Sequence, residues 1–271
     1  MGLIVVAAGL GLLLGLGQSE ERRFERAAAS EIRSKLGGDE KKVRVNVRPH
    51  GVGALQGDLT VAQIFAERFT LDELPLFTEP ERNPSGRIRS LQLRLTEFRL
   101  RGLLVQSLVA DIPECRYDFD LARRERTIRL ARSGQGTGSV TVRGTDLAEW
   151  IDRKYAEIKE CQVTLEDGWV RVDGYGEFVI VKSRFSVLAK LVSPDGRRVM
   201  LDRARITFDG VPADPMAAKV LLDVMNPVVD LDADLGLYGA VNVETIRAEN
   251  GLMIASGRTQ IPEKPAENTG I

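Results

Sequence analysis

The chain opens with an apolar run and continues as a series of segments in which hydrophobic and polar residues alternate. Residues 1–17 contain no charged side chain, and a helix over them would be a little shorter than a hydrocarbon core of about 30 Å. We therefore expect residues 1–18 to be a signal peptide or a short membrane anchor. Both interpretations stay open, because no basic residue precedes the run and residues 15–17 offer only a weak cleavage site.

Behind this run, hydrophobic residues recur at every second position, which is the pattern of half-buried β-strands. The alternation is clear over residues 43–47, 91–95 and 161–165. It is longest from Val179 to Leu191, where one strand of roughly fifteen residues would far exceed the usual length of about 5–6 residues. Turn signals between these runs favour antiparallel hairpins. They are Asp167 with Gly168, residues 193–196, and Asn250 with Gly251.

Two segments before residue 160 carry hydrophobic residues at helical spacing. The first covers residues 19–36 and ends at Gly37, a residue that favours a helix end. The second is expected over residues 146–158, with Thr145 as its N-cap. Its apolar stripe consists of Leu147, Trp150, Ile151, Tyr155 and Ile158.

A third helix is predicted to begin at Pro215 behind an Asp214 cap, since proline is favoured at the first helical position. The residues expected to be buried on it are Met216, Ala217, Val220, Leu221 and Val224. Residues 59–69 fit either a helix or a strand, because a capping-box pattern there lies among residues that favour a strand.

These elements predict an α+β fold in which a long, strongly curved antiparallel sheet wraps helices around an apolar groove, after an N-terminal membrane segment. The folded domain is expected over residues 19–261 and a disordered tail over residues 262–271. Such a sheet is either filled by side chains or leaves a tunnel, and the strand length together with only 6% aromatic residues favours the tunnel. The candidate groove-lining residues are Val179, Val181, Phe185, Val187, Leu191, Met200 and Ile206.

Composition excludes some classes of partner and site. The 38 basic and 39 acidic residues give a net charge of −1, so no overall positive charge draws the chain to nucleic acid. The two cysteines, Cys115 and Cys161, are too few for a disulfide framework and are not spaced as a metal site. We expect two buried, unpaired thiols, although pairing in an oxidising compartment stays open.

Catalytic and metal motifs are sparse. His50, the one histidine, lies between Pro49 and Gly51 in an expected surface turn, and no Gly-x-Ser-x-Gly elbow of the α/β-hydrolases occurs. Residues 230–236 resemble the start of a calcium loop, but Val241 stands where the bidentate Glu is needed. We therefore expect these acids on the solvent-exposed face of a strand. No catalytic residue, metal or cofactor is expected, although a serine assisted by Asp or Lys stays open.

A basic stretch offers a possible contact for anionic lipid headgroups. A solvated strand face is the simpler interpretation, since the residues around Ile128 alternate as a strand would. The stretch consists of Arg123, Arg124, Arg126, Arg129 and Arg132.

The order of these parts resembles that of a known family. In residues 138–155 a short strand leads into a helix that opens with Thr-Asp-Leu. The Val-x-Leu-x-Asp-Gly hairpin of residues 163–168 and the long strand follow, and then the turns at residues 194–196 and 250–251. Over residues 27–261 this order resembles the LmeA-like phospholipid-binding family.

The resemblance implies a fold similar to the tubular lipid-binding class, in which a curved sheet wraps a helix around an apolar groove. It also implies export behind the N-terminal apolar segment and a phospholipid or other membrane lipid as the partner. The expected function is therefore an exported, membrane-tethered or secreted lipid-binding or lipid-transfer protein of the cell envelope. A phospholipase-type enzyme on the same fold and a non-lipid envelope scaffold remain as alternatives.

Overall fold

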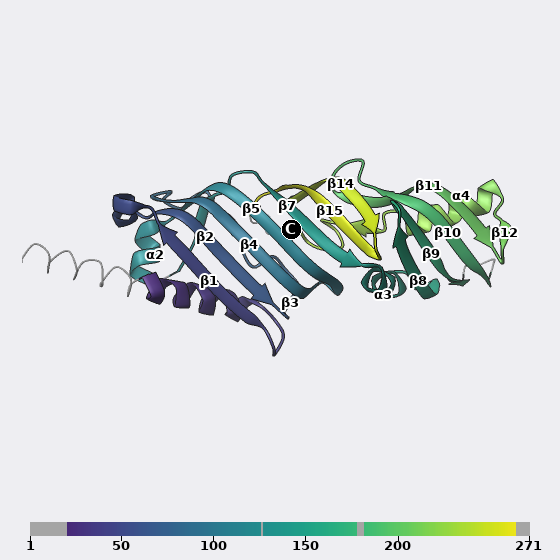
Figure 1. Cartoon of the computed structure of the whole chain (residues 1–271), viewed down its shortest axis with the longest axis horizontal. Coiled ribbons are helices and arrows are strands. Elements are labelled where there is room, and N and C mark those ends of the chain that lie inside the picture. Colours follow the sequence, from purple (N-terminus) through teal and green to yellow (C-terminus); the bar gives the residue numbers. More distant parts are fainter. Residues whose placement is uncertain (1–20, 126, 178–181, 264–271) are drawn as a thin grey trace, which may run out of the picture.

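The structure, a computed structural model, describes residues 21–125, 127–177 and 182–263. Two β-sheets lie end to end along the long axis of an elongated molecule (Figure 1). The predicted membrane segment, residues 1–18, lies outside the described residues. None of the helices in the described ranges has the length and hydrophobicity that a membrane crossing requires.

The first sheet contains nine strands, and its main path runs β1-β2-β4-β5-β7-β15-β14. Its neighbours pair antiparallel except that β2 and the short β3 both run parallel to β4. The expectation of a purely antiparallel sheet is therefore wrong at these two pairs. The strands are β1 (Lys42–Pro49), β2 (Asp58–Glu67), β3 (Thr70–Leu71), β4 (Gly86–Leu100), β5 (Leu103–Tyr117), β6 (Leu130–Arg132), β7 (Gly136–Arg143), β14 (Val241–Glu249) and β15 (Leu252–Thr259).

The second sheet contains six strands in the order β12-β11-β10-β9-β8, with β13 paired to β11. Two bulges interrupt it, one at Glu160 and one at Arg203, and both residues adopt positive φ. Bulges of this kind bend a strand and increase its twist. The strands are β8 (Ile158–Glu166), β9 (Trp169–Glu177), β10 (Lys182–Val192), β11 (Arg198–Phe208), β12 (Val211–Pro212) and β13 (Val229–Asp230).

The predicted long strand from Val179 to Leu191 is described from Lys182 onward, as β10. Its alternation is confirmed, because Phe185, Val187 and Leu191 are buried on one face. Val179 and Val181 lie outside the described residues. The longest strands in the described ranges are β4 and β5, with 15 residues each.

The helices confirm the predictions in part. A helix covers residues 21–35, here called the N-terminal helix. It lies along the first sheet (Figure 1). The others are η1 (Gly51–Gln56), α2 (Phe119–Glu125), α3 (Gly144–Lys154) and α4 (Pro215–Met225). Residues 59–69 are mainly strand β2, and α2 occupies part of the basic stretch that was expected to be a strand.

Helix α3 differs from its prediction at both ends. It is capped by the extended Arg143 without a side-chain hydrogen bond, rather than by Thr145. It ends at Lys154, four residues earlier than expected, because Tyr155 is extended and its hydroxyl donates to the carbonyl of Pro227 over 2.7 Å. Ile158, predicted on the helical stripe, is instead fully buried at the start of β8.

Helix α4 begins as predicted, but the face that it buries differs from the predicted one. The carboxylate of Asp214 accepts hydrogen bonds from the backbone N–H groups of Met216 and Ala217, with Pro215 in the first turn. Leu221 and Met225 are the buried residues of the helix. The expected burial of Met216 and Val220 is wrong, since both are exposed.

The acids of residues 230–234 stabilise turns, and of the three only Asp230 belongs to a strand. Asp230 accepts from the N–H groups of two residues that follow it, and Asp234 accepts from the N–H of Asp230. Asp232 pairs with Arg197, with Nη1 and Oδ2 2.9 Å apart. The strand predicted here is therefore only the two-residue β13, because the side chains satisfy the backbone donors that a ladder would use.

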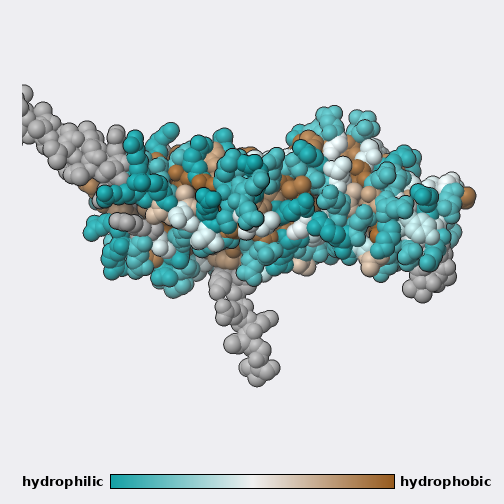
Figure 2. All heavy atoms as spheres, turned by 90° about the horizontal axis from the view of Figure 1, so that it is seen from below, coloured by the Kyte–Doolittle hydropathy of each residue, from teal (hydrophilic) through white to brown (hydrophobic). Residues whose placement is uncertain are grey.

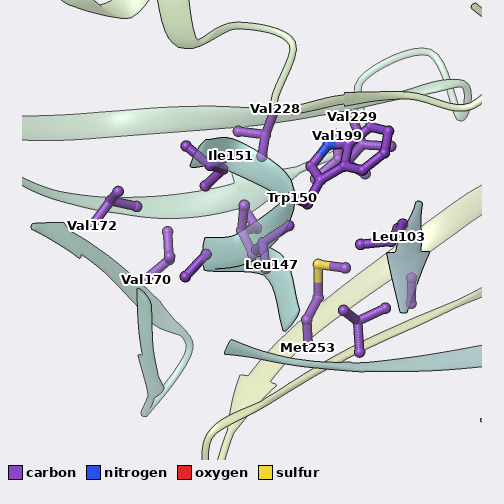
Figure 3. Packing of buried hydrophobic residues seen from close by; sticks show 14 of the residues in the cluster. Leu103, Leu147, Trp150, Ile151, Val170, Val172, Val199, Val228, Val229 and Met253 are labelled. Atoms are coloured by element: carbon purple, nitrogen blue, oxygen red, sulfur yellow. The ribbon is translucent and has the colours of Figure 1, made fainter. Parts of the chain in front are cut away.

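Two groups of buried side chains form the core. The larger joins the two sheets through α3, whose Leu147, Trp150 and Ile151 lie among valines of the second sheet (Figure 3). The smaller lies at the other end of the first sheet, around Ile112 and Tyr117. Pro262 also packs there, since its carbonyl accepts a hydrogen bond from the N–H of Thr78 over 2.8 Å. Residues 262–263 were expected in the disordered tail, so this boundary is wrong.

Candidate functional site

The inner face of the first sheet is a continuous apolar surface set by the strand register. Parallel pairing places Ile64 of β2 beside Leu93 of β4. Antiparallel pairing then places Leu93 beside Ala110, and Leu95 beside Leu108, on β5. Because side chains two residues apart share a face of a strand, three adjacent strands present hydrophobic residues on the same side.

A cavity of about 190 Å³ lies between this face and the N-terminal helix. Ile128 and segments around residues 74–76, 237–241 and 259–262 complete its walls. The N-terminal helix contributes Ala28, Glu31, Ile32 and Lys35 to the lining, and Leu36 follows directly after the helix. The strands contribute Ile64, Ala66, Leu71, Leu93, Leu95, Phe98, Leu100, Leu108, Ala110 and Ile112, and Phe69 lies in the link between β2 and β3. We call this cavity the groove.

The groove lies where the two buried clusters fail to meet. Phe69 and Leu100 in its lining belong to the larger cluster, and Ile112 belongs to the smaller one. Between them, Leu93 and Leu95 face inward but are only partly buried. Interiors are normally close-packed, so half-buried inward leucines around an open volume mark a place that the chain's own side chains leave unfilled.

Aromatic rings form one firm wall of the groove. The rings of Phe69 and Phe98 are stacked, with centroids 4.9 Å apart and planes 3° from parallel. Both residues are 2% exposed. A stacked pair of this kind adds about 0.5–1.5 kcal/mol beyond the burial of its area, so this wall is well packed.

Polar contacts hold the N-terminal helix over the groove. Oε1 of Glu25 accepts a hydrogen bond from the backbone N–H of Val47 over 2.9 Å. At the next turns, Glu31 pairs with Arg129 and with Lys35. Charged groups therefore meet the apolar lining at the edge of the groove. When the molecule is seen from below, hydrophobic residues are visible between polar ones over this half (Figure 2).

Gly37 lets the helix end pack closely against β3. It exchanges two backbone hydrogen bonds with Thr70, at 2.9 and 3.1 Å. A Cβ atom at Gly37 would lie 2.3 Å from Oγ1 of Thr70. A larger residue would therefore clash with the Thr70 side chain unless that side chain moved.

The predicted lining residues lie elsewhere in the structure. Phe185, Val187, Leu191 and Ile206 are buried in the larger cluster beneath the second sheet, and Met200 is half-buried on β11. Val179 and Val181 lie outside the described residues. The groove uses the first sheet instead, so a lipid contact of these seven residues stays a prediction. The alternation of Leu91, Leu93 and Leu95 was visible in the sequence, but their pairing with β2 was not.

His50 and the two cysteines occupy the expected settings. Nδ1 of His50 lies 3.2 Å from Oγ1 of Thr60 at an exposed turn. Cys115 and Cys161 are free and buried, which confirms the unpaired interpretation. Burial raises the pKa of both thiols, that of Cys161 to about 12.

The described residues contain no cluster of three or more His, Cys, Asp or Glu side chains that would hold a metal ion. In the basic stretch, Arg129 is ion-paired with Glu31 and Glu79, and Arg126 lies outside the described residues. The polar side chains that line the groove are Glu31, Lys35, Thr259 and Gln260. The chemistry of the site is therefore that of an apolar container with a charged edge.

Comparison with known proteins gives one match. A model of the LmeA-like phospholipid-binding family matches residues 20–258, a range that includes the N-terminal helix, both sheets and nearly all of the groove lining. No curated protein and no solved structure matches the chain.

Proposed function

This chain belongs to the LmeA-like phospholipid-binding family, and we propose that it holds an acyl chain of a phospholipid in the groove under the first sheet. The observation that carries the proposal is the row of inward but half-buried residues between the two core clusters, which includes Leu93, Leu95 and Leu108. An acyl chain would complete their burial, at about 0.8 kcal/mol for each CH₂ removed from water.

The size of the groove supports a partial occupant. Its volume of about 190 Å³ exceeds the roughly 150 Å³ of a cavity that holds benzene. It is smaller than the roughly 300–1,000 Å³ of sites that enclose a drug-sized ligand. The groove therefore suits one slender apolar tail, with the headgroup left at the charged edge near Glu31 and Lys35.

We further propose that the domain works outside the cytoplasm, next to a membrane. The apolar run of residues 1–17 precedes the N-terminal helix in the sequence, and that helix forms one wall of the groove. Two reporters are fused after Leu36, one that is active only outside the cytoplasm and one that is active only inside it. We expect activity of the first and not of the second. Activity of a cytoplasmic reporter alone would refute export.

The binding proposal is tested by filling the groove. Leu95→Trp places a large ring in open space and is expected to lower the binding of a fluorescent phospholipid by tenfold or more, which corresponds to about 1.4 kcal/mol. Its matched control is Thr96→Trp, one residue along β4 on the exposed face. Thermal unfolding of both variants shows that they remain folded.

The natural ligand is identified on the same material. Mass spectrometry of an organic extract of the purified protein is expected to find phospholipid with the unsubstituted chain and with Thr96→Trp, and less of it with Leu95→Trp. Equal lipid content in the unsubstituted chain and in both variants would show that the lipid binds outside the groove. Absence of lipid binding by the unsubstituted chain would refute the proposed function. Release of free fatty acid during the assay would instead favour the lipolytic alternative.

A further inference from the structure

The end of the molecule formed by β12 and α4 exposes several large hydrophobic side chains. Val211 is 65% exposed, Met216 is 73% exposed and Val220 is 51% exposed. Both elements lie at the end farthest from β1 and the N-terminal helix (Figure 1). Hydrophobic atoms are visible at this end in the space-filling view (Figure 2). We call Val211, Met216 and Val220 the apolar tip.

Helix α4 carries two apolar faces, which is unusual for a surface helix. Leu221 and Met225 are buried and hold the helix on the protein. Met216 and Val220 are four residues apart, so they form a second stripe on the opposite, exposed side. The exposed stripe does nothing for the packing of this chain, and large exposed apolar surfaces mark contact sites.

The segment that carries the tip contains no unpaired basic side chain. Residues 209–225 contain three aspartates and one lysine, so their formal charge is −2. The lysine, Lys219, is paired with Asp223, and Asp214 is used as the cap of α4. Attraction to an anionic surface would need unpaired basic residues, and this segment offers hydrophobic side chains instead.

The size of the tip argues against a second protein chain. Stable interfaces between proteins use about 20–30 residues on each side, whereas among the described residues the tip offers three large exposed hydrophobic side chains. A bilayer imposes no such requirement, because binding to it scales with whatever apolar area becomes buried. We propose that the apolar tip inserts into the surface of a zwitterionic phospholipid bilayer and docks the domain there by the end opposite to its N-terminal helix.

The proposal is tested on the full chain with a fluorophore that reports the polarity of its surroundings. Val220→Cys is labelled at its exposed thiol, and the unsubstituted chain, whose two cysteines are buried, gives the background. Addition of phosphatidylcholine vesicles is expected to shift the emission to shorter wavelength. The same label at the exposed position of Thr96→Cys, on the first sheet, is expected to stay in water.

Three results would overturn the proposal. The first is a label at position 220 that stays in water, whether or not the chain floats with the vesicles. The second is a shift that appears without vesicles as the protein concentration rises, which would identify a second copy as the occupant. The third is a shift that disappears at high salt, because screening weakens electrostatic contacts and leaves apolar insertion intact.

A second variant separates docking from binding in the groove. Met216→Ser combined with Val220→Ser is expected to slow the uptake of lipid from vesicles by about tenfold. Binding of a dispersed short-chain phospholipid is expected to stay unchanged, since the groove is intact. Unchanged uptake from vesicles would overturn docking by the tip. Leu95→Trp is expected to lower the binding of the dispersed lipid and to leave the insertion of the tip unchanged. The two proposals can therefore fail independently.

Discussion

Arg129 and Glu31 join two walls of the groove, with Nη1 of the arginine 2.6 Å from Oε1 of the glutamate. Glu31 belongs to the N-terminal helix, and Arg129 to the segment before β6. The same guanidinium lies 3.4 Å from Oε1 of Glu79. The Arg129 and Glu31 side chains are 29% and 23% exposed, so solvent screens this pair less than a fully exposed one. The contact therefore holds the helix against the rest of the groove.

Replacement of Arg129 by Met is expected to loosen the N-terminal helix. The loss of the pair costs about 1 kcal/mol, which is small against the stability of a domain but large for one docked helix. Hydrogen exchange of the backbone over residues 21–35 is expected to become faster, and bound lipid is expected to exchange more quickly.

The control for this variant is Lys42→Met, which removes the pair with Glu67. Those side chains are 67% and 42% exposed, and the pair joins β1 to β2 and not to the helix. Equal hydrogen exchange of residues 21–35 in both variants would show that the Arg129 contact does not hold the helix.

Replacement of Val187 by Trp distinguishes a filled core from a lipid site under the second sheet. Val187 is 0% exposed and packs in the larger cluster, so we expect overpacking that lowers the stability by about 1–3 kcal/mol. Lipid binding by the folded fraction is expected to stay normal. Thermal unfolding and fluorescent-lipid binding measure the two effects, and Arg184→Trp at an exposed position of β10 is the control. A folded variant that no longer binds lipid would instead place the predicted residues in the site.

The sequence predicts local structure well where one side chain or one periodicity decides it. The Asp214 cap, the alternation of β4 and the buried cysteines follow from short-range chemistry. The parallel pairing of β2 with β4 does not, because it joins strands separated by residues 68–85 and is decided by the tertiary packing of both. The groove depends on that pairing, which explains why the predicted lining was assigned to the longest alternating run instead.

The orientation of α4 is a second feature that the sequence does not predict. Met216, Val220, Leu221 and Met225 are all hydrophobic, so periodicity predicts a buried helix with no preference between its two apolar faces. The structure buries one face and exposes the other. A sequence gives no signal for which of two apolar faces meets the protein.

Protonation of Asp195 is expected to weaken the turn between β10 and β11. Its carboxylate accepts backbone N–H groups of Arg197 and Arg198 and pairs with the Arg198 side chain. The backbone hydrogen bond of Arg197, with the Arg198 contacts, lowers the pKa of Asp195 from 3.8 to about 2.

Because the folded-state pKa lies below the unfolded value, the charged form stabilises the fold above about pH 4. That contribution is lost as the pH falls toward 2. Asp195→Asn should therefore be less stable than the unsubstituted chain at pH 7 and differ little from it near pH 2. Urea unfolding across this range measures the difference, and a gap that is constant with pH would contradict the prediction.

Replacement of His50 by Ala is expected to leave lipid binding intact. The imidazole contacts Thr60 at an exposed turn, and it is absent from the groove lining. The measurement is fluorescent-phospholipid binding beside a thermal unfolding curve. A variant that folds normally but has lost binding or activity would make His50 a site residue and favour the enzymatic alternative.

The two cysteines are expected to resist alkylation in the folded protein and to react fully once it unfolds. Burial raises the pKa of Cys161 from 9.0 to about 12, which lowers its reactive thiolate fraction about a thousandfold at neutral pH. Burial raises the pKa of Cys115 as well. Iodoacetamide followed by mass spectrometry, with and without urea and without any reductant, measures both sites. Two modified thiols in urea would agree with the free pair in the structure, whereas two protected ones would reveal a disulfide and an oxidising compartment.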